Sequence, residues 1–188
     1  MATLKVAFAA AMLSLGMSAT ASAQTHYGIG RPATAAEIAG WNIDINREGT
    51  NLPPGSGNVA HGREVFEAQC SSCHGNKGEG GIGDKLVGGQ GTLASAKPVK
   101  TVVSYWPYAT TLFDYIRRAM PLNAPQSLSN DDVYALSAYL LSLNGIVPDT
   151  ATLDAKSLAA IKMPNRDGFV ADPRPDVKDK RCMKDCKP

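Results

Sequence analysis

The sequence is short of net charge, of aromatic side chains and of long apolar runs. Its 19 Lys and Arg residues nearly balance its 17 Asp and Glu residues, so the formal net charge is only +2. Because nucleic-acid binding needs a basic face, this balance argues against a nucleic-acid partner. Beyond the first residues no segment is apolar enough to span a bilayer, so no membrane span is expected in the mature chain.

Residues 1–23 are typical of a secretory signal peptide. Lys5 supplies a positive charge, residues 6–17 form an apolar stretch, and Ala21-Ser22-Ala23 matches the A-x-A cleavage pattern. The apolar stretch is shorter than the ~20 residues of a spanning helix. Small residues follow it rather than a basic cluster, so cleavage is favoured over a membrane anchor. We therefore expect an exported protein that works in a bacterial periplasm.

Two irregular extensions are expected on either side of a helical domain. Residues 24–57 are rich in Gly, Pro and small residues, with one short helix at 35–41 capped by Thr34 and a linker at 53–57. Residues 146–188 are broken by prolines and allow at most one short helix near 153–161.

The domain between them, residues 58–145, is predicted to be all-α. Helices are expected from the Asn58 cap to Cys70, from Thr110 or Thr111 through Arg118, and from a Ser129–Asp132 capping box to Gly145.

The residues with the clearest chemical meaning are Cys70-Ser71-Ser72-Cys73-His74. A C-x-x-C-H run is the attachment site of c-type haem. Both thiols add to haem vinyl groups, and the adjacent histidine binds the iron. The run occurs once, so one covalently bound haem c is predicted. Since aromatic residues make up only 6% of the chain, a haem would also supply apolar surface that this small domain lacks.

Other uses of these cysteines fit less well. A thioredoxin-like redox pair would need a βαβ setting, and none precedes Cys70. Structural zinc needs four ligands, and the remaining cysteines, Cys182 and Cys186, lie far down the chain. A disulfide inside the run would leave His74 without a role. The spacing of Cys182 and Cys186 suits a structural disulfide in an oxidising compartment.

An electron carrier keeps its iron six-coordinate, so a second axial ligand is expected. Met120, in Arg118-Ala119-Met120-Pro121, is the best candidate because it lies between two predicted helices, where the chain can pass over the opposite haem face. The alternative for Met120 is a gap-filling core residue. The competing ligands are Met163, Met183, His26 and His61.

These residues resemble those of class I cytochromes c. Gly62, Phe66 and Tyr139 match that family's helix-crossing positions, where a glycine lets the first and last helices approach closely. In the family a proline carbonyl after the histidine accepts the imidazole N–H. This chain has no proline in the corresponding residues 84–88, where Lys85 is the expected source of that carbonyl.

A narrower resemblance covers nearly the whole mature chain. Residues 27–34, 52–57, 98–101 with 104–108, 113–121 and 163–169 are similar to the cytochrome subunit of the periplasmic sulfane and sulfite dehydrogenases of the sulfur-oxidising (Sox) system. The lack of a second C-x-x-C-H run resembles the short, single-haem form. The resemblance also places Tyr105, Trp106, Arg117 and Arg118 where haem propionates need donors; the alternative is ordinary packing for the aromatic pair and solvent exposure for the arginines.

The resemblance implies single-electron transfer from a molybdenum-containing catalytic subunit to a downstream cytochrome c. Two other functions stay open. A free-standing soluble shuttle would have no dedicated partner, and long extensions argue against it because they suit wrapping a partner. A haem enzyme or gas sensor would need an open or easily displaced iron site, which Met120 as a ligand argues against.

Overall fold

The computed structural model describes residues 29–173. These residues belong to two compact units, which divide between Asn42 and Ile43. Predictions about other residues lie outside the described part of the chain: they concern the signal peptide, His26, Cys182, Met183 and Cys186. No helix within residues 29–173 has the length and hydropathy needed to cross a bilayer.

The first unit contributes one described helix, α2 (Ala35–Trp41). Thr34 caps it, with its side chain accepting from the Glu37 amide at 3.2 Å and Glu37 accepting from the Thr34 amide at 2.8 Å. This reciprocal pair satisfies the N–H groups left free at a helix start. The sequence-based prediction of a helix at 35–41 is confirmed.

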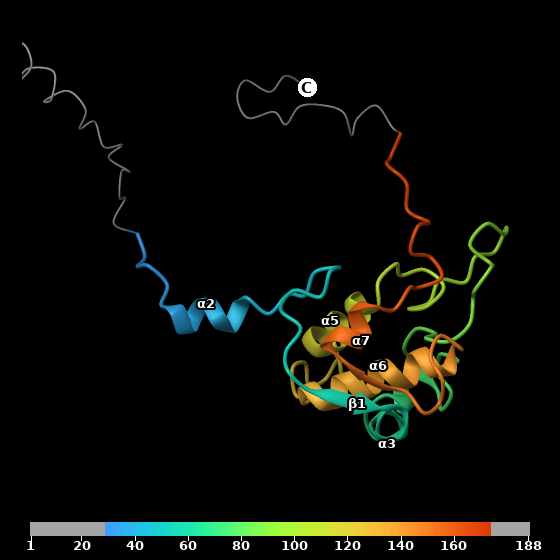
Figure 1. The fold of residues 1–188 in the computed structure, drawn as a ribbon, viewed down its shortest axis with the longest axis horizontal. Helices are drawn as coiled ribbons and strands as arrows, with labels where there is room; N and C mark the ends of the chain where they lie inside the picture. The colour runs from blue at the N-terminus through green and yellow to red at the C-terminus, as the bar shows by residue number, and fades with distance from the viewer. Residues whose placement is uncertain (1–28, 174–188) are drawn as a thin grey trace, which may run out of the picture. The chain divides into compact units, whose positions relative to one another are not determined.

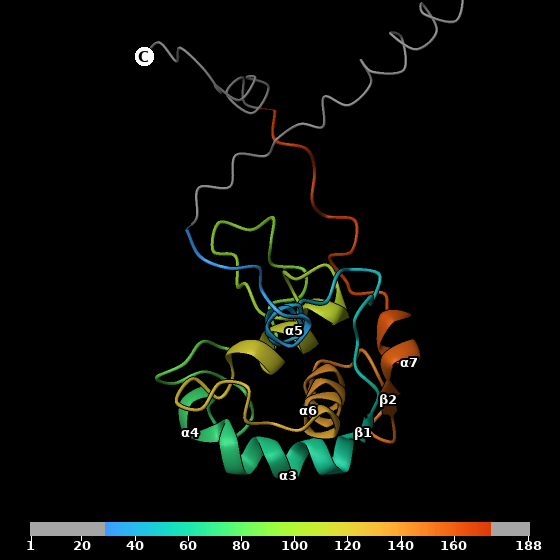
Figure 2. The same cartoon turned by 90° about the vertical axis from the view of Figure 1, so that its left-hand side faces the viewer.

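The second unit is mainly helical. It contains, in chain order, β1 (Ser56–Asn58), α3 (Val59–Gln69), α4 (Ser71–His74), α5 (Ala109–Ala119), α6 (Asn130–Leu143), β2 (Thr152–Asp154) and α7 (Ala155–Ala159). Figure 1 shows α6 between α3 and α5, and the turned view in Figure 2 agrees. Helix α6 is therefore the central element, and its buried residues run from Val133 to Leu141.

The N-terminal caps predicted for α3 and α6 are both present in the structure. The Asn58 side chain accepts from the His61 amide at 2.9 Å and begins α3. Ser129 and Asp132 form the predicted capping box at the start of α6. Gly145, in the left-handed conformation at φ 70°, follows the end of α6, as expected where a helix terminates. Helix α5 begins at Ala109, close to the predicted start.

Helices α3 and α6 cross with almost no space between them. A Cβ built on Gly62 would lie 1.9 Å from the Ala135 carbonyl oxygen, so only glycine fits at this point of α3. The Phe66 and Tyr139 rings pack beside it, with centroids 5.4 Å apart. The helix-crossing roles that the family resemblance implied for Gly62, Phe66 and Tyr139 are therefore confirmed.

The extensions are less irregular than the sequence predicted. Part of the expected linker forms β1, which pairs with β2 in an antiparallel ribbon in which Gly57 opposes Leu153. Figure 2 shows this ribbon and α7 on the opposite side of α6 from α4. Each strand spans three residues, too short for an alternating pattern to be visible in the sequence.

Residues outside the predicted domain also enter the core. Ile45, Leu153, Leu158 and Met163 are all buried in the same cluster as the helices. Part of each extension thus folds onto the helical domain itself. The argument that the extensions suit wrapping a partner therefore does not apply to these buried residues.

Candidate haem site

The C-x-x-C-H run consists of Cys70, the C-cap residue of α3, and the four residues of α4. The Cys70 amide donates to the Phe66 carbonyl at 2.9 Å, and the Cys70 carbonyl accepts from the amides of Cys73 and His74 at 3.1 and 3.0 Å. Both thiols are free; Cys70 is half-buried and Cys73 is exposed. Two sulfurs and an imidazole are therefore carried on one turn of chain.

The surroundings of Cys70 do not suit a thiol redox centre. Burial, reinforced by the neighbouring Cys73, raises the pKa of Cys70 to about 11. A reactive thioredoxin-like cysteine needs the opposite shift, because the thiolate is the nucleophile. The surroundings of Cys70 instead keep its thiol protonated, and both thiols are free for covalent attachment.

The His74 imidazole is held by the loop that follows it. Its Nδ1 lies 2.6 Å from the Asp84 carbonyl oxygen, so Nδ1–H donates and Nε2 is left with its lone pair. The prediction that Lys85 supplies this carbonyl is wrong by one residue. The preceding residue, Gly83, fixes which carbonyl reaches the ring. Its amide donates to the Cys73 carbonyl at 2.8 Å, and the carbonyl of the next residue, Asp84, then lies beside the His74 imidazole.

Gly83 also forms a cradle for the ring. A Cβ at this position would lie 2.9 Å from Cε1 and 3.0 Å from Nδ1 of His74, so a side chain would displace the imidazole. An imidazole whose Nδ1–H is fixed by a carbonyl, with Nε2 unprotonated, is the arrangement of an axial metal ligand. The donor set of Cys70, Cys73 and His74 fits a covalently attached haem.

Met120 follows the last turn of α5. Its amide donates to the Ile116 carbonyl at 3.0 Å, and its backbone then becomes extended, with Pro121 next. Its side chain is half-buried against the core. In Figure 2, α4 and the loop that follows α5 both lie to the left of α6.

The described competitors of Met120 have other surroundings. Met163 is 1% exposed and fully enclosed in the apolar core. His61 lies on the exposed side of α3, where its Nε2 is 2.7 Å from Asp132 Oδ1. Among the candidates within residues 29–173, Met120 is thus the one that is neither enclosed in the core nor paired with a carboxylate.

Comparisons with known proteins identify the family of the chain. Residues 59–144 match the family model for cytochrome c. A crystal structure of the sulfane dehydrogenase SoxCD from Paracoccus pantotrophus contains a chain 42% identical in sequence, with a TM-score of 0.75. The match covers 86% of this chain and 82% of that one. The chain belongs to the cytochrome c family.

Members of this family carry covalently bound haem c, and this cytochrome is an electron-transfer protein. The solved relative extends the likeness well beyond the helical domain that the family model matches. No curated protein sequence matches the chain.

Two of the side chains predicted to face haem propionates are held within the protein. Arg117 Nη1 donates to the Ile43 carbonyl at 3.2 Å. Arg118 pairs with Asp114, a buried carboxylate that also accepts from the Ile45 amide at 3.0 Å. Both arginines therefore help to fasten residues 43–45 to α5, an anchoring role that the sequence pattern did not indicate.

The aromatic pair of the cytochrome lies beside the start of α5. Lys100 Nζ is 4.8 Å from the Tyr105 ring centroid, and Phe169 packs edge-on against the same ring. Trp106 is half-buried and packs against Tyr115, with centroids 5.5 Å apart.

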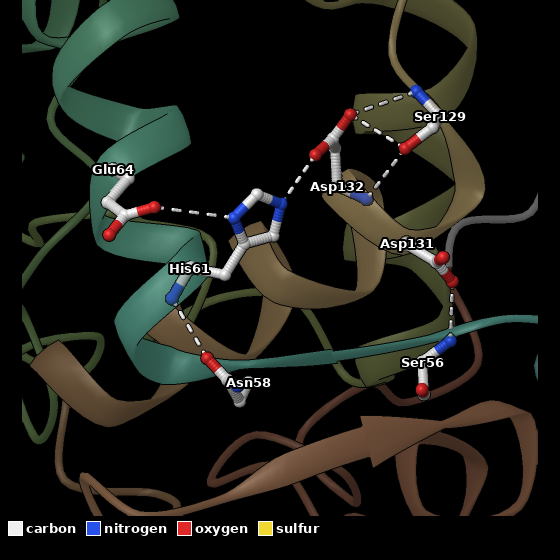
Figure 3. A network of polar contacts seen from close by, with 7 residues as sticks. All are labelled: Ser56, Asn58, His61, Glu64, Ser129, Asp131 and Asp132. Atoms are coloured by element: carbon white, nitrogen blue, oxygen red, sulfur yellow. Dashed lines mark hydrogen bonds and ion pairs between the residues drawn. The ribbon is translucent and has the colours of Figure 1, made fainter.

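A polar network ties the start of α3 to the start of α6 (Figure 3). It consists of Ser56, Asn58, His61, Glu64, Ser129, Asp131 and Asp132. The hydrogen bond to Asp132 raises the pKa of His61 above its usual value; partial burial opposes this, and Glu64 adds to it. The Ser56 amide donates to Asp131 at 2.8 Å, which brings β1 into the same network. The network therefore links the N-terminal turns of α3 and α6 and helps to hold the two helices together.

Proposed function

We propose that this cytochrome is the electron-accepting subunit of a periplasmic, molybdenum-containing sulfane or sulfite dehydrogenase, and that it passes single electrons to a downstream cytochrome c. The observation that carries the proposal is the 42% identity to a SoxCD chain over 86% of this one. A likeness that includes both extensions supports a shared partner more strongly than a likeness confined to the helical domain would.

We assign the haem contacts to this chain's own residues. Cys70 and Cys73 would form the thioether bonds, and His74 through Nε2 and Met120 through its sulfur would bind the iron. The single C-x-x-C-H run in the sequence implies one haem. Bound haem supplies a reversible one-electron couple, and a methionine ligand raises its potential relative to a second imidazole.

The propionate contacts come from a second group of side chains. Trp106 would donate through its indole N–H, and Arg117 through the guanidinium N–H groups that do not bind Ile43. Tyr105 completes this group from the same segment as Trp106. Charge-assisted hydrogen bonds of this kind orient the cofactor and offset the charge of its carboxylates.

The partner is tested by isolating the full-length protein with a tag from the periplasm of its own host. We expect a molybdenum-containing protein to co-purify, and sulfite or a sulfane-sulfur compound to reduce the haem of the complex. The control is the cytochrome separated from its partner, which the same compounds should not reduce. Elution as a lone monomer at low salt would instead favour the free-standing shuttle.

The Met120 ligand is tested by Met120→Ala. The variant is expected to lose the methionine-to-iron charge-transfer band of the oxidised protein, and its reduced form to bind CO without denaturant. Met163→Ala is the matched control: it should keep the band but lose about 2–5 kcal/mol of stability, because it removes a buried side chain. A Met120→Ala spectrum identical to that of the wild type would rule out the assignment.

A further inference from the structure

The orientation of the His74 ring depends on the position of two loop residues. The Asp84 carbonyl accepts from Nδ1, and Gly83 lies against the ring. The amides of Gly80 and Gly83 donate to the His74 and Cys73 carbonyls, both at 2.8 Å, and the Leu86 amide donates to the Gly78 carbonyl at 2.8 Å. These bonds hold the loop against the C-x-x-C-H turn, but none of them reaches α6.

Asn144, at the end of α6, attaches the loop to that helix. It caps the C-terminus of α6, 60 residues after Asp84 (144 − 84). Its Oδ1 accepts from the Gly88 amide at 2.8 Å, and its Nδ2 lies 3.4 Å from the Leu86 carbonyl. The Gln90 side chain donates to the Asn144 carbonyl at 3.1 Å.

The same side chain is itself fixed by α6. Its Nδ2 also donates to the Leu140 carbonyl at 2.8 Å, one of the carbonyls left unpaired at a helix end. Asn144 thus needs a donor and an acceptor together, which an amide offers and a carboxylate does not. On the other side of the loop, Thr101 donates to the Gly88 carbonyl at 2.8 Å, so both polar groups of Gly88 are held.

We propose that Asn144 is a positioning residue for the haem iron: it holds residues 86–90 on α6 and thereby sets how firmly Asp84 accepts from His74. The inference rests on His74 being the proximal ligand, as in the proposed function. A firmly held Nδ1–H makes the imidazole a stronger electron donor, which favours the oxidised iron and lowers the potential.

The test compares the full-length, haem-loaded protein with Asn144→Ala. Two quantities are measured: the midpoint potential and the exchange rate of the Gly88 amide hydrogen. We expect exchange at least tenfold faster and an upward shift in potential. The control is Asn130→Ala at the other end of α6, which removes an asparagine bonded to the Pro54 carbonyl and should change neither quantity.

Asn144→Gln is the second variant, in case the alanine variant does not fold. It keeps the amide one methylene farther out, so both quantities should move in the same direction by less. Faster Gly88 exchange with an unchanged potential, in either variant, would overturn the inference and leave Asn144 as a helix cap only. An equal shift in Asn130→Ala would also overturn it. The optical spectrum is recorded first: absence of haem from the wild-type protein would count against the proposed function instead.

Discussion

Replacing Cys70 and Cys73 together with alanine is expected to give a mature protein whose mass is that of the polypeptide alone. Both thiols lie free on one turn beside His74, and each forms one bond to the haem in the proposed site. Without them the haem would be held only by the axial ligands and would be lost on denaturation. Intact-mass spectrometry of the denatured protein measures the effect directly.

Ser72→Ala is the matched control for this variant. Ser72 lies between the two cysteines and is exposed, so its removal should leave the haem attached and the spectrum unchanged. Retention of covalent haem by the double cysteine variant would contradict the site. So would a wild-type protein with no mass beyond its amino acids.

Gly62→Ala is expected to destabilise the cytochrome by about 3 kcal/mol, the upper end of the usual cost of overpacking. The added methyl would lie 1.9 Å from the Ala135 carbonyl oxygen and 2.8 Å from the Tyr139 Cβ. Because the nearest atoms are backbone, a rotamer change cannot relieve the clash, and α3 must move away from α6. Thermal unfolding of the haem-loaded protein, followed by circular dichroism, measures the loss.

Gly40→Ala serves as the control for the glycine substitution. Gly40 also lies inside a helix, α2, but a Cβ there would meet nothing within 4 Å. Alanine is the better helix former by about 1 kcal/mol, and α2 is outside the haem unit. The melting temperature of the haem unit should therefore not fall. A Gly62→Ala protein as stable as the wild type would mean that the helices do not cross this closely.

The helices of the domain could be predicted because their signals are local. Asn58 and the Ser129–Asp132 box mark helix starts within a few residues of the groups they cap. Gly62, Phe66 and Tyr139 could be placed at the crossing through the family resemblance. The attachment turn is equally local, since five consecutive residues carry its chemistry.

What the sequence did not reveal depends on residues far apart in the chain. The pairing of Gly57 with Leu153 has no signal in either short strand. Asn144 looks like an ordinary helix end until the loop at residues 86–90 is seen against it. The choice of Asp84 over Lys85 followed from the Gly83 amide, and nothing in the order of the residues favours one carbonyl over the other.

The β1–β2 ribbon has a consequence for how small this cytochrome can become. The segment matched by the family model, residues 59–144, omits both strands and also the buried side chains of Ile45, Leu153, Leu158 and Met163. In a protein trimmed to that segment, the apolar surface that these residues now cover would be exposed to water. The cost in folding free energy would be on the order of 1.5–3 kcal/mol for each large side chain. Deletion alone would therefore destabilise this cytochrome; each shortening would need new polar residues on the sides of α5 and α6 that it exposes.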